Sequence, residues 1–386
     1  MQKTYLFILL ASLCFLSFET QATVIFVDYS SAGTNTGASW TNAFTTLQPA
    51  LNAASAGDSI FIAEGTYKPT LDPSSGTASG NTRDYAFYLD KDIKIYGGFA
   101  GTETALSQRD IGSNPVILSG DIGTSGSNSD NCHHIFITDG LSSAAVLDGV
   151  TITGGNANAS SGSITYSGQT IEKKFGGGLY NYSSSPTLTN LTISGNAAIH
   201  AGGGLYNYSS SPTLTNVTIS GNTASSYNGG GLYNYSSSPT LTNVTISGNT
   251  ASSGGGGIFN YNGSSPTITN TIFWGNKTGS SPPTTNVAGA DIKNASSSTA
   301  IITYSLVQLA SSSYTSGNSN LLTTNTNMVY ATDPSFNDAS DPDGADNVWM
   351  TADDGLNIIN SPAYGVGKSS GAPSTDITGA SRASSP

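Results

Sequence analysis

Charged side chains that could do acid–base chemistry lie outside the centre of the chain. Between Gly176 and Asn276 the sequence contains no Asp, Glu, Lys or Arg. General acid–base catalysis and two-carboxylate glycoside hydrolysis therefore lack the groups they need in this segment. The flanking segments hold the remaining candidates, which are Asp121, Asp130, His133, His134, Asp139, Asp148, and Lys173 with Glu172. From these residues alone we assign no catalytic residue.

A second set of candidate ligands lies near the C-terminus, in an acidic segment that contains Gly344. Oxygen ligands at alternating positions coordinate Ca²⁺ in many protein loops. The candidate metal ligands are Asp341, Asp343, Asp346, Asp353 and Asp354. The match to a complete calcium loop is partial, and acidic turns of this composition also occur as solvated loops. Calcium is therefore the one cofactor that the sequence suggests, with a plain solvated loop as the alternative.

Aromatic residues recur at the same two positions of four successive repeats and form a third candidate site. They are Tyr180, Tyr182, Tyr206, Tyr208, Tyr233, Tyr235, Phe259 and Tyr261. Because Leu205 is expected to point into a core, the alternation of a strand turns Tyr206 and Tyr208 outward. Two exposed aromatic columns could stack on sugar rings or act as an adhesive surface. The alternative is that the stacked rings only stabilise a sheet.

The repeats themselves are the strongest feature of the sequence. Units that begin at Gly176, Gly202, Gly229 and Gly255 read GGGLYNYSSSPTLTNLTISGN or a close variant, with a period of 26 to 27 residues. A degenerate earlier copy, LDGVTITGGN, begins at Leu147. A period of this length is typical of a solenoid. We therefore predict a repeat core over residues 147–276, with an inserted loop at 157–175.

Each unit should be a coil of three short strands. No segment has the helical period of 3.6, whereas all of them alternate with period two. The inward residues Leu214 and Val217 are three positions apart, so a corner must fall at Asn216. The serines before Pro212 mark another corner, and Gly221 with Asn222 opens the third. Stacked in parallel, such coils would place identical residues in ladders.

The asparagines of the repeats are explained by those ladders. One set, Asn190, Asn216, Asn243 and Asn270, can stack at a corner, and a second, Asn181, Asn207, Asn234 and Asn260, can stack inside. A column of identical amides satisfies the hydrogen-bonding needs of each buried member. We therefore interpret them as structural and not as a ligand site.

The flanks should close the two ends of the solenoid. Phe44, Leu47, Leu51 and Ala54 fall at helical spacing, which predicts a short capping helix within an N-terminal region, 23–146, of irregular early rungs. Residues 277–386 should form C-terminal rungs and an irregular cap. The sequence stops at Pro386 with no visible anchoring segment, as expected of a truncated chain. Ile272 and Trp274, in place of Thr and Ser, suggest that the fourth repeat is the terminal, capping rung.

The N-terminus predicts export. Lys3 is followed by an apolar run from Tyr5 to Phe18 and by small residues up to Ala22, the pattern of a cleavable signal peptide over residues 1–22. We therefore expect an extracellular or outer-surface location, with no transmembrane segment in the mature chain. Cys132 is then the only thiol, expected to be a small buried residue.

The net charge of −12, with only 12 Lys and Arg in total, argues against nucleic acid as a partner.

The run VDYSSAGTNTGASWTNAFTTLQPALNAASAGDSIFIAEGTYKPT, with the later IYGGFAGTETALSQRDIG and LDGVTITGGNAN, resembles bacterial secreted β-helix proteins of the pectin-lyase-like superfamily. The GGGL motif and the final FWGN are similar to the repeats of polymorphic outer-membrane proteins. The resemblance implies an all-β, right-handed parallel β-helix, and enzymes on this scaffold use clustered carboxylates with Arg or Lys. It also implies a surface or adhesin-type role.

Taken together, these features predict a non-catalytic β-solenoid, adhesin-like or structural, whose partners would be a polysaccharide, a cell-surface glycan or a second copy of itself. The alternative is a polysaccharide lyase or glycoside hydrolase with its site in the charged flanks. Fold alone does not decide between them, because function resides in a site.

Overall fold

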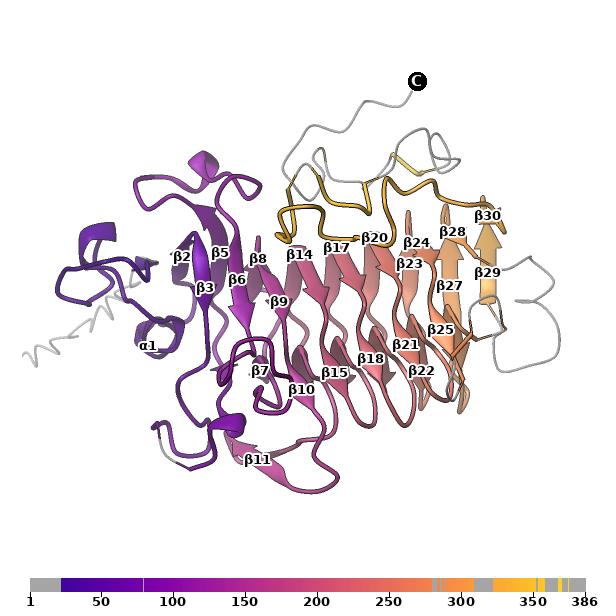
Figure 1. Ribbon diagram of the computed structural model, residues 1–386, viewed down its shortest axis with the longest axis horizontal. Helices are drawn as coiled ribbons and strands as arrows, with labels where there is room; N and C mark the ends of the chain where they lie inside the picture. The colour runs from indigo at the N-terminus through magenta and orange to yellow at the C-terminus, as the bar shows by residue number, and fades with distance from the viewer. Residues whose placement is uncertain are drawn as a thin grey trace, which may run out of the picture.

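The protein is an elongated parallel β-helix in which each coil of the chain adds one rung to the stack (Figure 1). The computed structural model describes residues 22–78, 80–279, 283–284, 287, 289–308, 322–351, 353–357, 367–369 and 374. Within these residues nearly all regular structure is parallel strand, as the sequence predicted. The predicted signal peptide lies outside the described residues, apart from Ala22.

The largest sheet has 16 strands in the described part of the chain and covers two sides of the coil. Its strands are β1 (Val24–Val27), β2 (Ser59–Ala63), β3 (Gly65–Tyr67), β5 (Lys94–Phe99), β6 (Val116–Ser119), β8 (Val146–Asp148), β9 (Thr151–Thr153), β14 (Thr187–Ser194), β17 (Thr213–Ser220), β20 (Thr240–Ser247), β23 (Thr267–Thr269), β24 (Ile272–Trp274), β27 (Ala300–Thr303), β28 (Leu306–Val307), β29 (Leu322–Thr326) and β30 (Val329–Tyr330).

The third side is a seven-stranded sheet, which we call the aromatic face. It consists of β4 (Phe87–Leu89), β7 (Phe136–Asp139), β13 (Leu179–Tyr182), β16 (Leu205–Tyr208), β19 (Leu232–Tyr235), β22 (Ile258–Tyr261) and β26 (Ile292–Asn294). A narrow sheet of two-residue strands joins the sides: β10 (Asn156–Ala157), β15 (Ala197–Ala198), β18 (Thr223–Ala224), β21 (Thr250–Ala251) and β25 (Lys277–Thr278).

The bend between the first two sides falls where the sequence placed a corner. Asn216 has a φ of +54°, and the residue-by-residue pairing of β14 with β17 skips it. Asparagine tolerates this left-handed conformation better than most residues do. On either side of the bend, Leu214, Val217 and Ile219 point inward and are at most 1% exposed. The coil therefore closes around an apolar core.

Both predicted asparagine ladders are present. Inside the core, the Nδ2 of Asn181, Asn207 and Asn234 each donates to the Oδ1 of the next asparagine at 2.8–2.9 Å. At the corner, the amide of Asn270 donates to Asn243 at 3.0 Å, and the column continues back to Asn190.

A third ladder, which the sequence had assigned to turn geometry, runs through Asn196, Asn222, Asn249 and Asn276. Asn222 is fully buried, and only its neighbour Gly221 takes a positive φ. The asparagine of the Gly-Asn pair is therefore explained by the hydrogen bonds of its side chain and not by a left-handed backbone conformation.

The predicted N-terminal helix is α1 (Leu47–Ala53), which packs against β1 and β4 near the first rungs. Its apolar side chains Leu47 and Leu51 belong to the continuous core. Three short 3-10 helices, η1 (Trp40–Asn42), η2 (Thr82–Asp84) and η3 (Leu106–Gln108), lie in the loops of the same region. The capping helix is thus confirmed.

Two expectations about the flanks were wrong. Residues 157–175 are more than a loop, because β11 (Ser163–Tyr166) and β12 (Gln169–Glu172) form an antiparallel hairpin. The fourth repeat is not the terminal rung, since β22 pairs with β26 and β24 pairs with β28, whose register places Ile272 beside Leu306. These later rungs lie within residues 277–386, where C-terminal rungs were expected, so the error was only to take the fourth repeat as the last rung.

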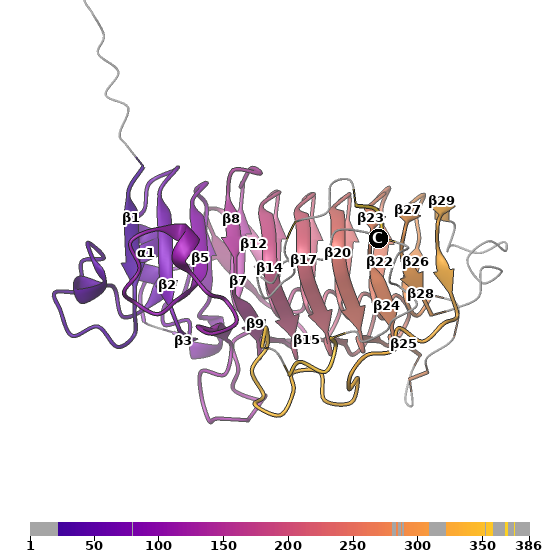
Figure 2. The ribbon, with the colours of Figure 1, turned by 90° about the horizontal axis from the view of Figure 1, so that it is seen from above.

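The C-terminal segment lies along the side of the solenoid. After β30 the described chain turns back beside β20, β17 and β14 (Figures 1 and 2). Lys368 attaches it to the corner ladder, because its backbone N–H donates to Asn270 Oδ1 at 2.8 Å and its carbonyl accepts from Asn270 Nδ2 at 2.9 Å. This contact covers the last asparagine of the corner column.

Candidate ligand-binding face

Aromatic side chains project in two columns from the aromatic face. The inner column consists of Tyr180, Tyr206, Tyr233 and Phe259, and the outer column consists of Tyr182, Tyr208, Tyr235 and Tyr261. Because β13, β16, β19 and β22 pair without a register shift, each ring lies beside its counterpart one rung away. All eight predicted site residues are therefore brought together on one face.

The inner column is less exposed than the sequence predicted. Tyr180, Tyr206 and Phe259 are only 3–4% exposed, whereas Tyr233 is half-buried. The hairpin of β11 and β12 packs against the start of this column, and the ring of Phe175 stacks on Tyr206 at 4.7 Å. The prediction of an exposed inner column was wrong at Tyr180 and Tyr206 because the insert folds back over them, and Phe259 is buried as well.

Burial also fixes the chemistry of the inner column. It raises the pKa of the Tyr180, Tyr206 and Tyr233 hydroxyls above the usual tyrosine value. These groups stay neutral at physiological pH, because the phenolate would be poorly solvated. The inner column is thus part of a second apolar core, outside the coil.

The outer column remains half-exposed along four rungs. Its rings stack with centroids 5.1 Å apart between Tyr182 and Tyr208 and between Tyr208 and Tyr235, with planes within 16° of parallel. Each ring face is therefore covered by the next ring. What remains for a ligand is a row of ring edges and phenolic hydroxyls, one per rung, which can donate and accept hydrogen bonds.

One aromatic ring that the sequence analysis did not single out completes the face. Tyr227 is 49% exposed and stacks on the His200 imidazole at 4.3 Å. In the next rung Gly254 pairs with Asn228, so Ser253 stands where Tyr227 stood. No ring follows Tyr227 in its column, which leaves one ring face open. The His200 imidazole is half-buried in this stack.

An acidic pair lies at the N-terminal end of the outer column. Asp139 is the register partner of Tyr182, so it continues the column by one rung. Asp90 lies close enough that its charge, after burial, raises the pKa of Asp139. Asp90 also accepts a hydrogen bond from Tyr166 of the hairpin. Of the flank candidates, Asp139 continues the outer column, whereas His134 packs edge-on against Tyr180 of the inner column at 5.7 Å.

Three other flank candidates, Asp148, Lys173 and Glu172, are engaged in structural contacts. Asp148 forms an ion pair with Arg109 at 2.7 Å and accepts from Asn190 at the start of the corner ladder. Lys173 pairs with Asp84 at 2.8 Å, while Glu172 pairs with Lys174. Lys173 and Glu172 therefore pair with other residues and do not form a functional pair with each other.

The two histidines are buried beneath the insert. His133 Nδ1 lies 3.2 Å from the carbonyl of Asn156, and His134 Nδ1 lies 2.9 Å from that of Gly176. Burial lowers the pKa of both imidazoles to about 4. A carbonyl can only accept, so each Nδ1 carries the proton and each Nε2 is left as an acceptor.

Several carboxylates of the C-terminal acidic segment accept hydrogen bonds from backbone N–H groups. Asp354 accepts from the N–H groups of Met350 and Thr351, and burial raises its pKa to about 6. Asp353 accepts from Asp346, and Asp346 accepts from Val348. Among the described residues, no three Asp, Glu, His or Cys side chains form a group that could hold a metal ion. Calcium binding at Asp341 and Asp343 stays a prediction.

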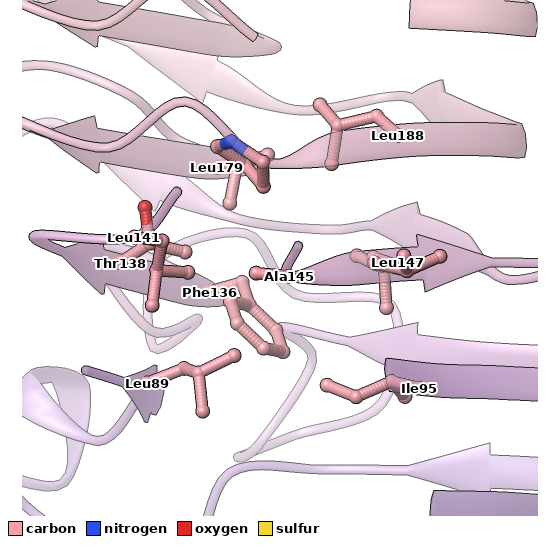
Figure 3. Close-up of a pocket in the computed structure, with 11 residues that line it drawn as sticks. Leu89, Ile95, Phe136, Thr138, Leu141, Ala145, Leu147, Leu179 and Leu188 are labelled. Atoms are coloured by element: carbon pink, nitrogen blue, oxygen red, sulfur yellow. The ribbon is translucent and has the colours of Figure 1, made fainter. Parts of the chain in front are cut away.

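Hollows in the structure do not offer a better site. One cavity of about 10 Å³ lies inside the coil, between Leu89, Phe136, Leu147 and Leu188 (Figure 3). It has room for no more than a water molecule. A wider, open hollow of about 350 Å³ lies beside Trp40 and Asp28 in the N-terminal loops.

Cys132 is fully buried, as predicted, and burial raises its pKa to about 12.

No helix among the described residues has the length and apolar character to cross a bilayer.

The chain is similar to solved structures and to one described family. Among solved structures, the pectin methylesterase of Aspergillus niger, in deglycosylated and in penultimately deglycosylated form, aligns with 80% of this chain and 85% of its own at 14% identity and a TM-score of 0.38. No curated protein matches the sequence. The family described as the right handed beta helix region matches residues 124–326, just over half of the chain. The chain therefore belongs to the right-handed β-helix family.

Proposed function

We propose that this protein is an exported, non-catalytic β-helix that binds a linear glycan along the outer tyrosine column. The column in question is Tyr182, Tyr208, Tyr235 and Tyr261. Export rests on the predicted signal peptide over residues 1–22. An adhesin-like role at the cell surface would follow if the glycan belongs to another cell. Self-association through the same face is the competing outcome.

The observation that carries the proposal is the row of half-exposed tyrosines in register. Parallel strands repeat every 4.8 Å or so along the stack, so hydroxyls are offered at a constant spacing. A polymer of neutral sugars presents its own hydroxyls at a constant repeat and can pair with such a row without any charge. The open ring face of Tyr227 adds one place where a sugar ring could stack.

The absence of charge from the repeats favours this class of ligand. From Gly176 to Asn276 the sequence has no ionisable group except His200 and the tyrosines. An acidic or basic ligand would find no counter-charge on these rungs. A neutral polysaccharide requires none, because hydrogen bonds and aromatic contacts supply its affinity.

The test removes hydroxyls and leaves the rings in place. The double variant Tyr208→Phe/Tyr235→Phe keeps the stack, while Tyr29→Phe removes a hydroxyl from an exposed residue in the N-terminal loops. Each hydrogen bond contributes about 0.5–1.5 kcal/mol, so the loss of two, about 1–3 kcal/mol, predicts an affinity about 5- to 160-fold lower. Retention on a panel of neutral polysaccharides should fall for the double variant only. Equal retention of all three proteins would refute binding along the column.

A second function is favoured by the acidic pair at the end of the column. If a glycan lies along the tyrosines, its end reaches Asp139 and Asp90, and two neighbouring carboxylates are the groups that glycoside hydrolysis uses. The raised pKa of Asp139 suits a general acid. Release of reducing or unsaturated ends in the same panel, abolished by Asp139→Asn, would establish this function. Retention without products would leave the binding function.

A further inference from the structure

Buried acceptors without a partner are concentrated in one small region. Six buried side-chain atoms of the described residues have no hydrogen-bond partner, and five of them belong to the region of Asp84 and residues 121–134. They are the Oδ1 atoms of Asp84, Asp121, Asp130 and Asn131 and the Nε2 of His134. An unsatisfied buried polar atom calls for a bound water or ion. Asp84 already pairs with Lys173, and its Oδ1 lies 3.8 Å from His133 Nε2, so the oxygens of Asp121, Asp130 and Asn131 are the ones that remain to be explained.

Three of these atoms belong to one loop, residues 121–131, which closes on itself. The carbonyl of Gly120 accepts from the N–H groups of Ile122 at 2.9 Å and Cys132 at 3.0 Å. Asp121 and Asn131 therefore lie together where the loop begins and ends. A β-carbon placed on Gly154 would lie 3.4 Å from the backbone N of Asp121 and 3.6 Å from Asn131 Nδ2. The two residues thus approach the same point.

The hydrogen bonds of the loop fix the orientation of each side chain. Asn131 Nδ2 donates to the Gly154 carbonyl at 2.6 Å, so its Oδ1 is the atom left over. One carboxylate oxygen of Asp121 accepts from Gly126 at 3.1 Å, and one of Asp130 accepts from Thr124 at 2.7 Å. Each residue keeps one oxygen for another ligand. Asn131 is only 2% exposed, so water from the bulk does not reach its side chain freely.

No positive side chain takes up these oxygens. Neither Asp121 nor Asp130 forms an ion pair in the described part of the chain, although Lys173 and Arg109 pair with other acids nearby. Arg83, the closest guanidinium, donates to the carbonyls of Asn131 and Asn156 and to the side chain of Asn158. The Arg83 guanidinium is near enough to Asp130 for their charges to interact, but it forms no ion pair with either carboxylate.

We propose that the loop 121–131 is a calcium site, in which Asp121, Asp130 and Asn131 supply Oδ1 ligands and water or backbone carbonyls complete the shell. Oxygen-only donors from carboxylates and an amide are the set that Ca²⁺ prefers. A loop rich in Gly, Ser and Asn can adjust to its irregular coordination. With two charged ligands the affinity should resemble that of extracellular calcium modules, a Kd of about 10⁻⁴–10⁻³ M. The site is independent of the proposed glycan face.

The experiment is calorimetric titration of CaCl₂ into the purified full chain after dialysis against a chelator. Asp121→Asn/Asp130→Asn removes both charges and keeps an oxygen that can accept from Gly126 and Thr124, so the loop can still close. We expect this variant to bind at least tenfold more weakly than the natural chain. The matched control, Asp72→Asn/Asp110→Asn, removes the same charge from two other N-terminal loops, where each side chain also keeps an oxygen that can accept from the backbone, of Ser74 and of Ser113. This control should bind calcium as the natural chain does.

Hydrogen exchange gives a second readout, independent of calorimetry, that locates the binding site along the chain. Calcium should slow exchange of the amides at 122–131 in the natural chain and in the matched control, and should leave exchange of these amides unchanged in the Asp121→Asn/Asp130→Asn variant. Mg²⁺ at the same concentration should protect less, because it demands a tighter octahedral shell. The proposal is overturned if the natural chain binds no calcium, if the loop variant binds calcium equally well, or if calcium gives the amides at 122–131 no protection in the natural chain.

Discussion

Replacement of one asparagine inside the coil tests whether the ladders hold the solenoid together. Asn207 is fully buried, donates its Nδ2 to Asn234 at 2.9 Å and accepts from Asn181 at 2.9 Å. Asn207→Ala removes both bonds and leaves a buried donor and a buried acceptor without partners. Each such group costs about 1–3 kcal/mol, so the variant should lose about 2–6 kcal/mol of unfolding free energy. That is a large share of a total that is commonly 5–15 kcal/mol.

Urea unfolding followed by circular dichroism measures the loss. The control, Ser211→Ala, lies in the same coil and also removes a ladder hydrogen bond, from the backbone of Ser238, but its side chain is exposed. Water can replace that bond, so the control should stay within about 0.5 kcal/mol of the natural chain. If Asn207→Ala is no less stable than Ser211→Ala, the inner ladder contributes nothing measurable and the argument from buried amides fails.

Three further outcomes follow from the buried groups. His133 and His134 have pKa values lowered to about 4, so the unfolded chain takes up protons at a higher pH than the folded chain does. The free energy of unfolding should therefore fall as pH drops from about 6.5 to 4, by up to about 3 kcal/mol for each histidine. A His134→Gln variant should show a flatter profile of stability against pH. Asn216→Val places a β-branched residue at a φ of +54° and should cost about 1–3 kcal/mol in urea unfolding, more than Asn216→Gly. Cys132 should react with a thiol reagent only as fast as the chain unfolds.

The structure of the coil could be predicted because the same sequence pattern recurs in every unit. Alternation fixed the inward residues of one unit, and four near-identical units then forced the register, so Leu214 and Asn216 were placed correctly from sequence. Ladders follow from the same identity, since a side chain that recurs at each rung must meet its own copy. These inferences needed no knowledge of tertiary contacts.

The insert could not be placed in the same way. Its strands carry a hairpin pattern, with Ser167 and Gly168 at positive φ between alternating apolar residues, and this could have been recognised. What the sequence did not contain was the face on which the hairpin lies. Ile164 and Tyr166 cover the inner aromatic column through contacts between segments of unrelated sequence. Burial of Tyr180 and Tyr206 therefore had no local signature, and neither did the approach of Asp90 to Asp139.

Register also explains why charge and repetition occupy separate parts of the molecule. A charged residue inside the repeat would recur one rung away, about 4.8 Å from its copy. Two like charges at that distance repel by about 1 kcal/mol in water and by about 3.5 kcal/mol at an effective dielectric constant of 20. A column of four would add this cost at every step, whereas tyrosines and amides stabilise their own copies. Charges such as Asp148 and Lys293 therefore appear only in rungs that have diverged. The repeated face is limited to neutral recognition, and any ion binding or acid–base chemistry must use the loops and rungs outside it.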